Sequence, residues 1–218
     1  MAKKKPAQVS GKKTLPQKEE PRTGMPLSTQ TIYWFLLILL LVFVAGIRFR
    51  MLSLPLERDE GEYAYMGQLL LKGYAPFSHA YNMKFPGTSI MYALFMFFFG
   101  QTSEGVHLGF FVINAGSIII LFVAARRFLG NMVAIVAAAT YALISMSPAL
   151  FGSAAHATHY VILFALAGLY LLLVALERQK KMQFFLSGLL LGFGILMKQP
   201  GIFFALFGGL IFIYDQFL

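Results

Sequence analysis

Four acidic side chains gather in one short stretch of the sequence, E-R-D-E-G-E at residues 57–62. An ionised carboxylate can take a proton from a hydroxyl within hydrogen-bond reach, so such a cluster suits general-base catalysis. A structural role competes with this interpretation, because Asp59 stands where a helix N-cap belongs and the helix dipole stabilises first-turn acids. Capping accounts for only one of the acids. We therefore predict that Asp59 and Glu60 take part in catalysis.

The acidic run continues into a short amphipathic helix, which the pattern predicts from Glu60 to Lys72. Tyr63, Met66 and Leu70 recur at three- and four-residue spacing, which sets them on one helical face, and Gly73 ends the pattern. This helix would hold the acids at its N-terminal end.

Two lysines outside this helix could supply positive charge to the same chemistry. Lys84 lies in N-M-K-F-P-G between two apolar segments, and Lys198 follows a later apolar segment in the pair K-Q. A lone lysine at such a place is most often a snorkelling anchor. Beside a phosphate, it would be the counter-charge.

Two histidines, His156 and His159, stand three residues apart in H-A-T-H. This spacing could direct both rings to one metal ion, with Asp59 or Glu60 completing the shell. We favour the alternative, in which both are hydrogen-bonded polar residues at a wet helix end. The sequence thus predicts no metal and no other cofactor, and a divalent metal stays the alternative.

Composition indicates the elements that must position these residues. The chain is 58% hydrophobic and only 12% charged, whereas a soluble domain carries about 25% charged residues. Its apolar side chains therefore need lipid as their solvent. We predict an all-α fold, a polytopic transmembrane helical bundle with amphipathic interfacial helices in its first extracytoplasmic loop.

Seven apolar blocks divide the chain. They are Ile32–Ile47, Phe85–Phe99, Val106–Ala125, Val133–Leu150, Tyr160–Leu176, Phe184–Met197 and Ile202–Ile213. A helix rises about 1.5 Å per residue, so the block from Phe85 to Phe99 would reach about 22 Å, short of roughly 30 Å of hydrocarbon.

Basic residues orient the blocks. Arg126–Arg127 and Glu177–Lys181 are separated by two blocks, so they share one side of the membrane, which the positive-inside rule assigns to the cytoplasm. The block Phe85–Phe99 must then begin and end outside, as an interfacial or re-entrant helix. Residues 57–84, residues 152–159 and Lys198 consequently fall together on the extracytoplasmic face.

The N-terminal residues 1–30 form a polar tail that contains seven basic and two acidic residues. Such a stretch has little apolar surface to bury, so we predict a disordered cytoplasmic tail. We interpret it as a topology determinant beside anionic membrane lipids and not as a nucleic-acid-binding segment.

The order of several motifs resembles one family. The run L-E-R-D-E-G-E-Y, L-L-K-G, N-M-K-F-P-G and F-F-G, followed by A-A-R-R-F-L-G, G-S-A-A-H-A-T-H-Y and S-G-L-L-L-G-F-G-I-L-M-K-Q, is similar to the GT-C membrane glycosyltransferases. The branch it resembles holds the protein O-mannosyltransferases and the lipid A aminoarabinose transferases. The resemblance covers about residues 32–213.

This resemblance implies a multi-pass cell-membrane enzyme of the cell envelope. It would move a sugar from a polyprenyl-phosphate donor to a hydroxyl of a lipid, glycan or protein acceptor, with inversion at the anomeric carbon. The resemblance puts the catalytic acid at Asp59, with Glu60 beside it. The residues expected to bind substrate are Arg58, Glu62, Tyr63, Lys84, His156, His159, Lys198 and Gln199.

Two features depart from the family pattern. Many relatives carry a second acid before the block that starts at Tyr160, whereas this chain has Thr158 or His159 there. The family also usually runs to more than twice this length. We therefore expect residues 31–218 to be the N-terminal part of a GT-C-like module with about six spans, truncated at its C-terminus.

Two other functions compete with an enzyme. A transporter or channel places ionisable residues near the bilayer midplane, whereas the block interiors here hold at most Asn114, Ser117 and Thr140. A non-catalytic scaffold would explain the spans, but it gives no reason for acids and lysines to meet on one face.

Overall fold

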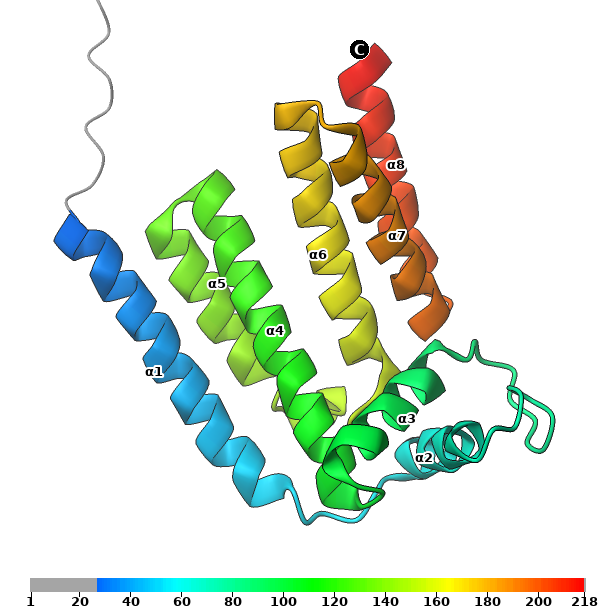
Figure 1. Ribbon diagram of the computed structural model, residues 1–218. Coiled ribbons are helices and arrows are strands. Elements are labelled where there is room, and N and C mark those ends of the chain that lie inside the picture. Colours follow the sequence, from blue (N-terminus) through cyan, green and yellow to red (C-terminus); the bar gives the residue numbers. More distant parts are fainter. Residues whose placement is uncertain (1–26, 218) are drawn as a thin grey trace, which may run out of the picture.

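The computed structural model describes residues 27–217, and within this range every regular element is helical (Figure 1). The predicted all-α bundle is confirmed. The predicted tail lies mostly outside the described residues, but residues 27–30 are already the first turn of a helix.

The described residues form eight α-helices and one short 3₁₀ turn. They are α1 (Leu27–Met51), α2 (Arg58–Leu71), α3 (Gly87–Phe99), α4 (Ser103–Leu129), α5 (Asn131–Ile144), the 3₁₀ turn Pro148–Leu150, α6 (Ala157–Arg178), α7 (Lys181–Met197) and α8 (Gly201–Phe217).

Six of these helices, α1 and α4 to α8, stand side by side and alternate in direction, while α2 and α3 lie across one end of them (Figure 1). Within residues 27–217, three helices are long and apolar enough to cross a membrane: Gln30–Met51, Ser103–Leu129 and Ala157–Arg178. The helices α5, α7 and α8 are apolar but shorter. The chain is therefore an integral membrane protein.

Small side chains let the long helices approach one another closely. Ala134, Ala138 and Ala142 recur every fourth residue of α5 and are fully buried against α1 and α4. A Cβ atom built on Gly109 of α4 would lie 2.0 Å from the ring of Phe95 on α3. In lipid no hydrophobic force drives helices together, so they associate through the close packing that small residues allow.

The short helix α3 packs on α2, α4 and the end of α7. Its first residues are joined to α7, because the Thr88 hydroxyl donates to the Met197 carbonyl oxygen at 2.8 Å. Gly87 allows this contact, since a Cβ there would lie 2.4 Å from the Leu196 carbonyl oxygen. A 13-residue helix at the end of the bundle agrees with the predicted helix that does not cross the membrane.

The predicted block Val133–Leu150 is wrong at its C-terminal end. The helix α5 stops at Ile144, and a short 3₁₀ turn, Pro148–Leu150, comes before α6 begins. This segment is held by Arg48 of α1, whose side chain is buried, with only 4% of it exposed. Its guanidinium donates to the Ser145 carbonyl oxygen at 2.8 Å and to that of Gly152 at 2.5 Å.

We predict that Arg48→Leu lowers the thermal midpoint of the detergent-solubilised protein by roughly 5–10 °C. Two buried carbonyl oxygens would lose their donors, at a cost of about 1–3 kcal/mol each. Arg50→Leu is the matched control, because Arg50 lies exposed on the same helix. Equal midpoints for the two variants, measured by tryptophan fluorescence during heating, would show that the Arg48 contacts do not hold the segment.

Candidate active site

The acidic run forms the N-terminus of α2, but its cap is Glu57 and not Asp59, and the helix begins two residues before the predicted start at Glu60. The Glu57 carboxylate accepts the Asp59 N–H at 2.8 Å, and the Glu60 carboxylate accepts the Glu57 N–H at 2.8 Å. This reciprocal arrangement is a capping box. Because Glu57 satisfies the helix end, the carboxylate of Asp59 is available for other contacts.

Glu60 points into the protein and is 2% exposed. Its Oε1 accepts the Ala155 N–H at 2.5 Å and lies 3.2 Å from Nε2 of His107, whose Nδ1 faces the Leu52 carbonyl oxygen at 2.9 Å. Burial by itself would raise the pKa of Glu60, but the contacts with His107 and Ala155 outweigh it and lower that pKa. Glu60 is thus a buried anion that ties α2 to α4 and to the segment before α6.

Asp59 faces the opposite way, toward Lys84. The Lys84 ammonium lies 3.4 Å from Oδ2 of Asp59 and 3.2 Å from Oε2 of Glu62, and it sits 4.8 Å above the ring of Tyr63. Burial opposes ionisation of Asp59, yet the positive charge of Lys84 prevails and lowers the pKa of that carboxyl. At neutral pH this group is an ion pair at the protein surface, with Asp59 22% exposed.

His156 and Lys198 reach the same place from distant parts of the chain. His156 Nε2 lies 3.8 Å from Oδ2 of Asp59, and its ring stacks on Phe151. Burial and the positive charge of Lys198 lower the pKa of His156, so the ring is neutral at pH 7. Burial and the Lys84 ammonium likewise lower the pKa of Lys198, which makes no ion pair within the described part of the chain.

An open hollow lies over the Asp59–Lys84 pair. Its lining residues are Arg58, Asp59, Glu62, Tyr81, Asn82, Met83 and Lys84. Gln199 lies beside this hollow, because its amide donates to the carbonyl oxygen of the lining residue Met83 at 3.1 Å. Arg58 is 91% exposed and reaches Asp59 at 3.5 Å. A substrate in this hollow would meet a carboxylate and cations at once.

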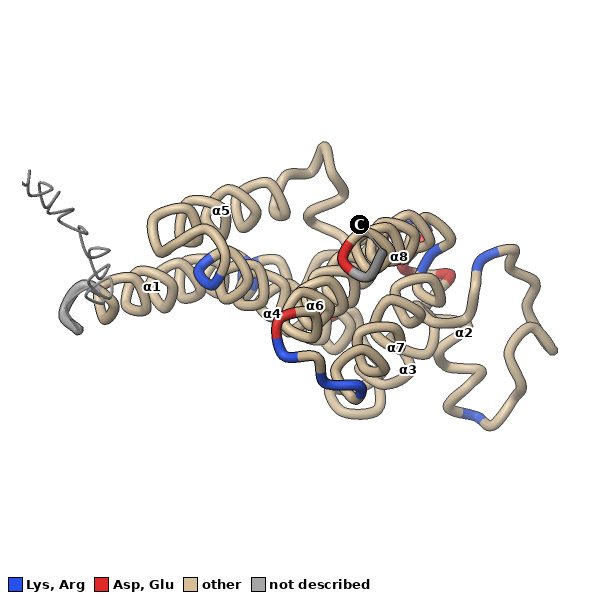
Figure 2. The backbone as a smooth tube through the Cα atoms, turned by 90° about the horizontal axis from the view of Figure 1, so that it is seen from above, with Lys and Arg blue, Asp and Glu red and all other residues tan. Residues whose placement is uncertain are grey.

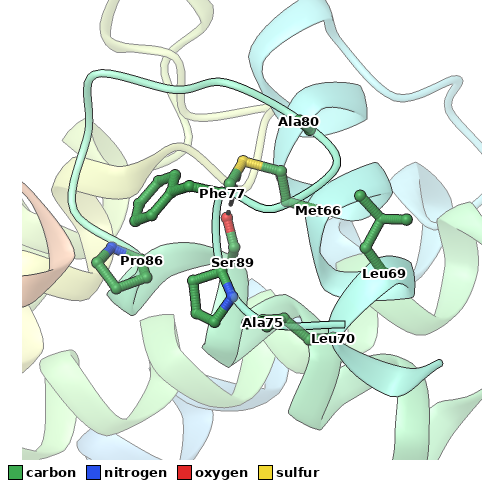
Figure 3. Close-up of a pocket in the computed structure, with 9 residues that line it drawn as sticks. Met66, Leu69, Leu70, Ala75, Phe77, Ala80, Pro86 and Ser89 are labelled. Carbon is green, nitrogen blue, oxygen red and sulfur yellow. Dashed lines mark hydrogen bonds between the residues drawn. The ribbon is translucent and has the colours of Figure 1, made fainter. Parts of the chain in front are cut away.

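The loop that carries Lys84 is held over α2 and α3 by apolar packing (Figure 3). A small apolar pocket between them is lined by Met66, Leu69, Leu70, Ala75, Pro76, Phe77, Ala80, Pro86 and Ser89. The Ser89 hydroxyl points at the sulfur of Met66, 3.7 Å away (Figure 3). We read this pocket as a packing contact that positions the loop.

Two predicted binding residues lie away from the hollow. His159 is 5% exposed, and its ring packs edge-on against Phe110. Tyr63 is 1% exposed and contributes only its ring face, beneath Lys84. His156 and His159 therefore do not face one ion, and among residues 27–217 no three His, Cys, Asp or Glu side chains are grouped to hold a metal.

Sequence reasoning missed His107 and Ala155 as the partners of Glu60. A histidine just inside an apolar block is a signal that could have indicated His107, since a buried imidazole needs a polar partner. No sequence pattern could have indicated the Ala155 contact, because its donor is a backbone N–H that lies 95 residues from Glu60 along the chain.

Comparison with known proteins gives one match. The family model of dolichyl-phosphate-mannose-protein mannosyltransferases matches residues 79–216. The matched range includes Lys84, His156 and Lys198 and begins after the acids of α2. No curated protein and no solved structure matches the chain.

We predict that Glu60→Gln lowers the thermal midpoint above about pH 5 and that this difference from the wild type shrinks as the pH falls. The folded protein lowers the pKa of Glu60, so its ionised form stabilises the fold above the unfolded pKa of about 4.3 and loses that effect on acidification. Melting curves from pH 7 to pH 4 measure it. Glu62→Gln is the control, because that carboxylate is 39% exposed. A pH-independent gap for Glu60→Gln would refute a contribution from its charge.

Proposed function

The chain belongs to the dolichyl-phosphate-mannose-protein mannosyltransferase family, a family of membrane glycosyltransferases, and from this membership we propose which of its residues perform the transfer. The reaction we propose moves a sugar from a polyprenyl-phosphate donor to an acceptor hydroxyl, with inversion, in the hollow over Asp59 and Lys84. The observation that carries it is the meeting of a partly exposed carboxylate, Asp59, with two lysines at the end of the bundle bearing α2 and α3.

Asp59 is the proposed general base. It lies in the hollow, it is ionised at neutral pH, and because Glu57 caps the helix its carboxylate is not used as the cap and faces the hollow instead. Before a substrate binds, the ion pair with Lys84 makes Asp59 a weaker base. When the Lys84 ammonium turns toward a bound phosphate, the attraction is shared and the carboxylate becomes more basic.

Lys84 and Lys198 are the proposed counter-charges of the departing lipid phosphate. The two ammonium groups lie near enough for Lys84 to lower the pKa of Lys198, which is a repulsion that a bound anion would relieve. Cations fixed where negative charge develops stabilise the transition state more than the ground state. Arg58, exposed at the rim, is positioned to add a third contact.

The other predicted residues take secondary roles in this proposal. Glu62 and Tyr63 hold Lys84 between them, while His156 and Gln199 border the hollow. Glu60 touches no open space, so we now assign it a positioning role in place of the predicted catalytic one. Because the ring of His159 is buried against Phe110, we no longer propose it as a substrate ligand.

We place this site on the extracytoplasmic face. The opposite end of the bundle bears the basic residues Arg126, Arg127, Arg178, Lys180 and Lys181, and the positive-inside rule favours the cytoplasm for that end. A donor with a lipid tail would then reach the hollow from the outer leaflet.

We predict that Asp59→Asn lowers transfer about 10²–10⁴-fold with only a small fall in the thermal midpoint from the lost ion pair with Lys84, because asparagine keeps the shape but cannot accept the proton. The measurement is release of polyprenyl phosphate from labelled polyprenyl-phosphate mannose in membranes that contain the native acceptors. Glu57→Ala is the matched control, since it removes the cap, lowers the free energy of unfolding by about 1 kcal/mol and leaves the proposed catalytic carboxylate in place.

Lys84→Ala and Lys198→Ala should raise the KM for the donor and also lower kcat in the same assay, because the ammonium groups both bind the donor phosphate and stabilise the charge that develops on it. Addition of EDTA should leave the rate unchanged if ammonium groups and not a metal neutralise the phosphate. Wild-type rates for Asp59→Asn would remove Asp59 from the mechanism and move the base to Glu62.

We also predict opposite accessibility of the two ends of the bundle. The chain has no cysteine, so Ser78→Cys and Gln179→Cys each introduce one exposed thiol. In intact cells, an impermeant thiol reagent should label the first variant and not the second. Labelling of both from outside would contradict the proposed orientation.

A further inference from the structure

A second hollow lies at the end of the bundle opposite the candidate active site. It opens between α1, α4, α5 and α6, has a volume of about 430 Å³, and is lined by Gln30, Arg126, Arg127, Gly130, Asn131 and Tyr170. Seen along the bundle, basic segments occur where α4 and α6 end (Figure 2). The proposed sugar transfer makes no use of this hollow.

The charge of this hollow is positive. The Arg126 guanidinium sits 5.0 Å above the ring of Trp34 on α1, and within the described range no carboxylate lies within salt-bridge distance of it. Arg127 is paired with Glu177 of α6, so that acid is already neutralised. Among residues 27–217, one arginine charge at this hollow therefore has no acidic partner, and an anion would neutralise it.

The hollow lies at the depth of lipid headgroups. Trp34 is 39% exposed, and tryptophan and tyrosine at helix ends mark the membrane interface. Arg126, stacked on this ring, lies at the same level. A phosphate at that depth most directly belongs to a phospholipid.

A separate apolar groove lies nearer the middle of the bundle on two of the same helices. It is lined by Leu36, Leu39, Leu40 and Phe43 of α1 and by Ile135 and Ala139 of α5, which lie roughly one to four helical turns from Gln30 and Asn131 of the hollow. The two helices stand side by side (Figure 1) and pack on one another. A positive hollow and an apolar groove on the same two helices offer separate places for an anionic headgroup and one acyl chain.

We propose that the Arg126 hollow binds the headgroup of an anionic phospholipid, with an acyl chain in the groove between α1 and α5. The phosphate accepts hydrogen bonds from the guanidinium of Arg126, which keeps its stack on Trp34. Charge selects this lipid over a zwitterionic one, because the ammonium of phosphatidylcholine would meet an unneutralised arginine.

Trp34 makes this proposal measurable, because it is the single tryptophan of the chain. The purified protein is reconstituted in vesicles that contain phosphatidylglycerol or phosphatidylcholine with brominated acyl chains, which quench tryptophan fluorescence on contact. Brominated phosphatidylglycerol should associate with Trp34 about fivefold more strongly than brominated phosphatidylcholine. This ratio should fall to about one in Arg126→Gln and persist in Arg126→Lys.

A matched control separates this site from general surface charge. Arg178→Gln removes the same charge from an exposed position at the same end of the bundle, and it should keep the fivefold ratio. Ala139→Phe fills the groove and should lower the ratio while leaving Arg126 in place. Circular dichroism of each variant checks that the helices are intact.

Three outcomes would overturn the proposal. Equal quenching by both lipids in the wild type shows that the hollow does not select anionic lipid. An equal loss in Arg178→Gln and Arg126→Gln attributes selection to net charge. Reversal by inorganic phosphate, together with no effect of Ala139→Phe, would identify a site for free phosphate in place of a lipid.

Discussion

Two charged side chains, Arg48 and Glu60, are buried in a bundle whose outside faces lipid, and both find partners in the segment that joins α5 to α6. Arg48 binds carbonyl oxygens of that segment, at Ser145 and Gly152, and Glu60 accepts the N–H of Ala155. A buried ion that loses its partners is costly, so each contact strongly restricts where the segment can lie. The position of His156 beside Asp59 follows from these contacts, because it is the next residue after Ala155.

The need of buried polar groups for partners also explains why the acids at the N-terminal end of α2 make different contacts. Glu57 and Glu60 satisfy backbone groups and a histidine, and only Asp59 and Glu62 face the hollow. A catalytic carboxylate has to be held in place while its oxygens stay free. In the proposed reaction the neighbouring acids fix the end of the helix, and the ion pair with Lys84 favours the ionised form of Asp59.

Lipid contact shapes both ends of the molecule in different ways. At the candidate active site, exposed apolar side chains lie beside the ion pairs, with Tyr81 86% and Met83 78% exposed. At the other end, arginines stand beside Trp34 and an apolar groove. The two proposed ligands, a lipid-linked donor and a charged headgroup, each combine a negative charge with an apolar chain, and each of these surfaces offers cations beside apolar side chains.

The sequence by itself determined the class of the protein, the helices and the side chains that meet at one end. Apolar block length and the low charge content predicted the bundle, and the spacing of arginines and lysines predicted that Lys84, Lys198 and the α2 acids would share a face. These are local properties of the sequence, because the length, apolar content and flanking charge of each segment decide whether and how it crosses the membrane.

Only the tertiary structure decided which way each side chain points. Helical spacing suggested that His156 and His159 act together, yet His156 is the extended residue before α6, with φ −67° and ψ 145°, so the two rings diverge. The burial of Arg48 and of Glu60 depends on partners up to 104 residues away. No local pattern encodes such contacts, because they exist only once distant helices have packed and removed the solvent around them.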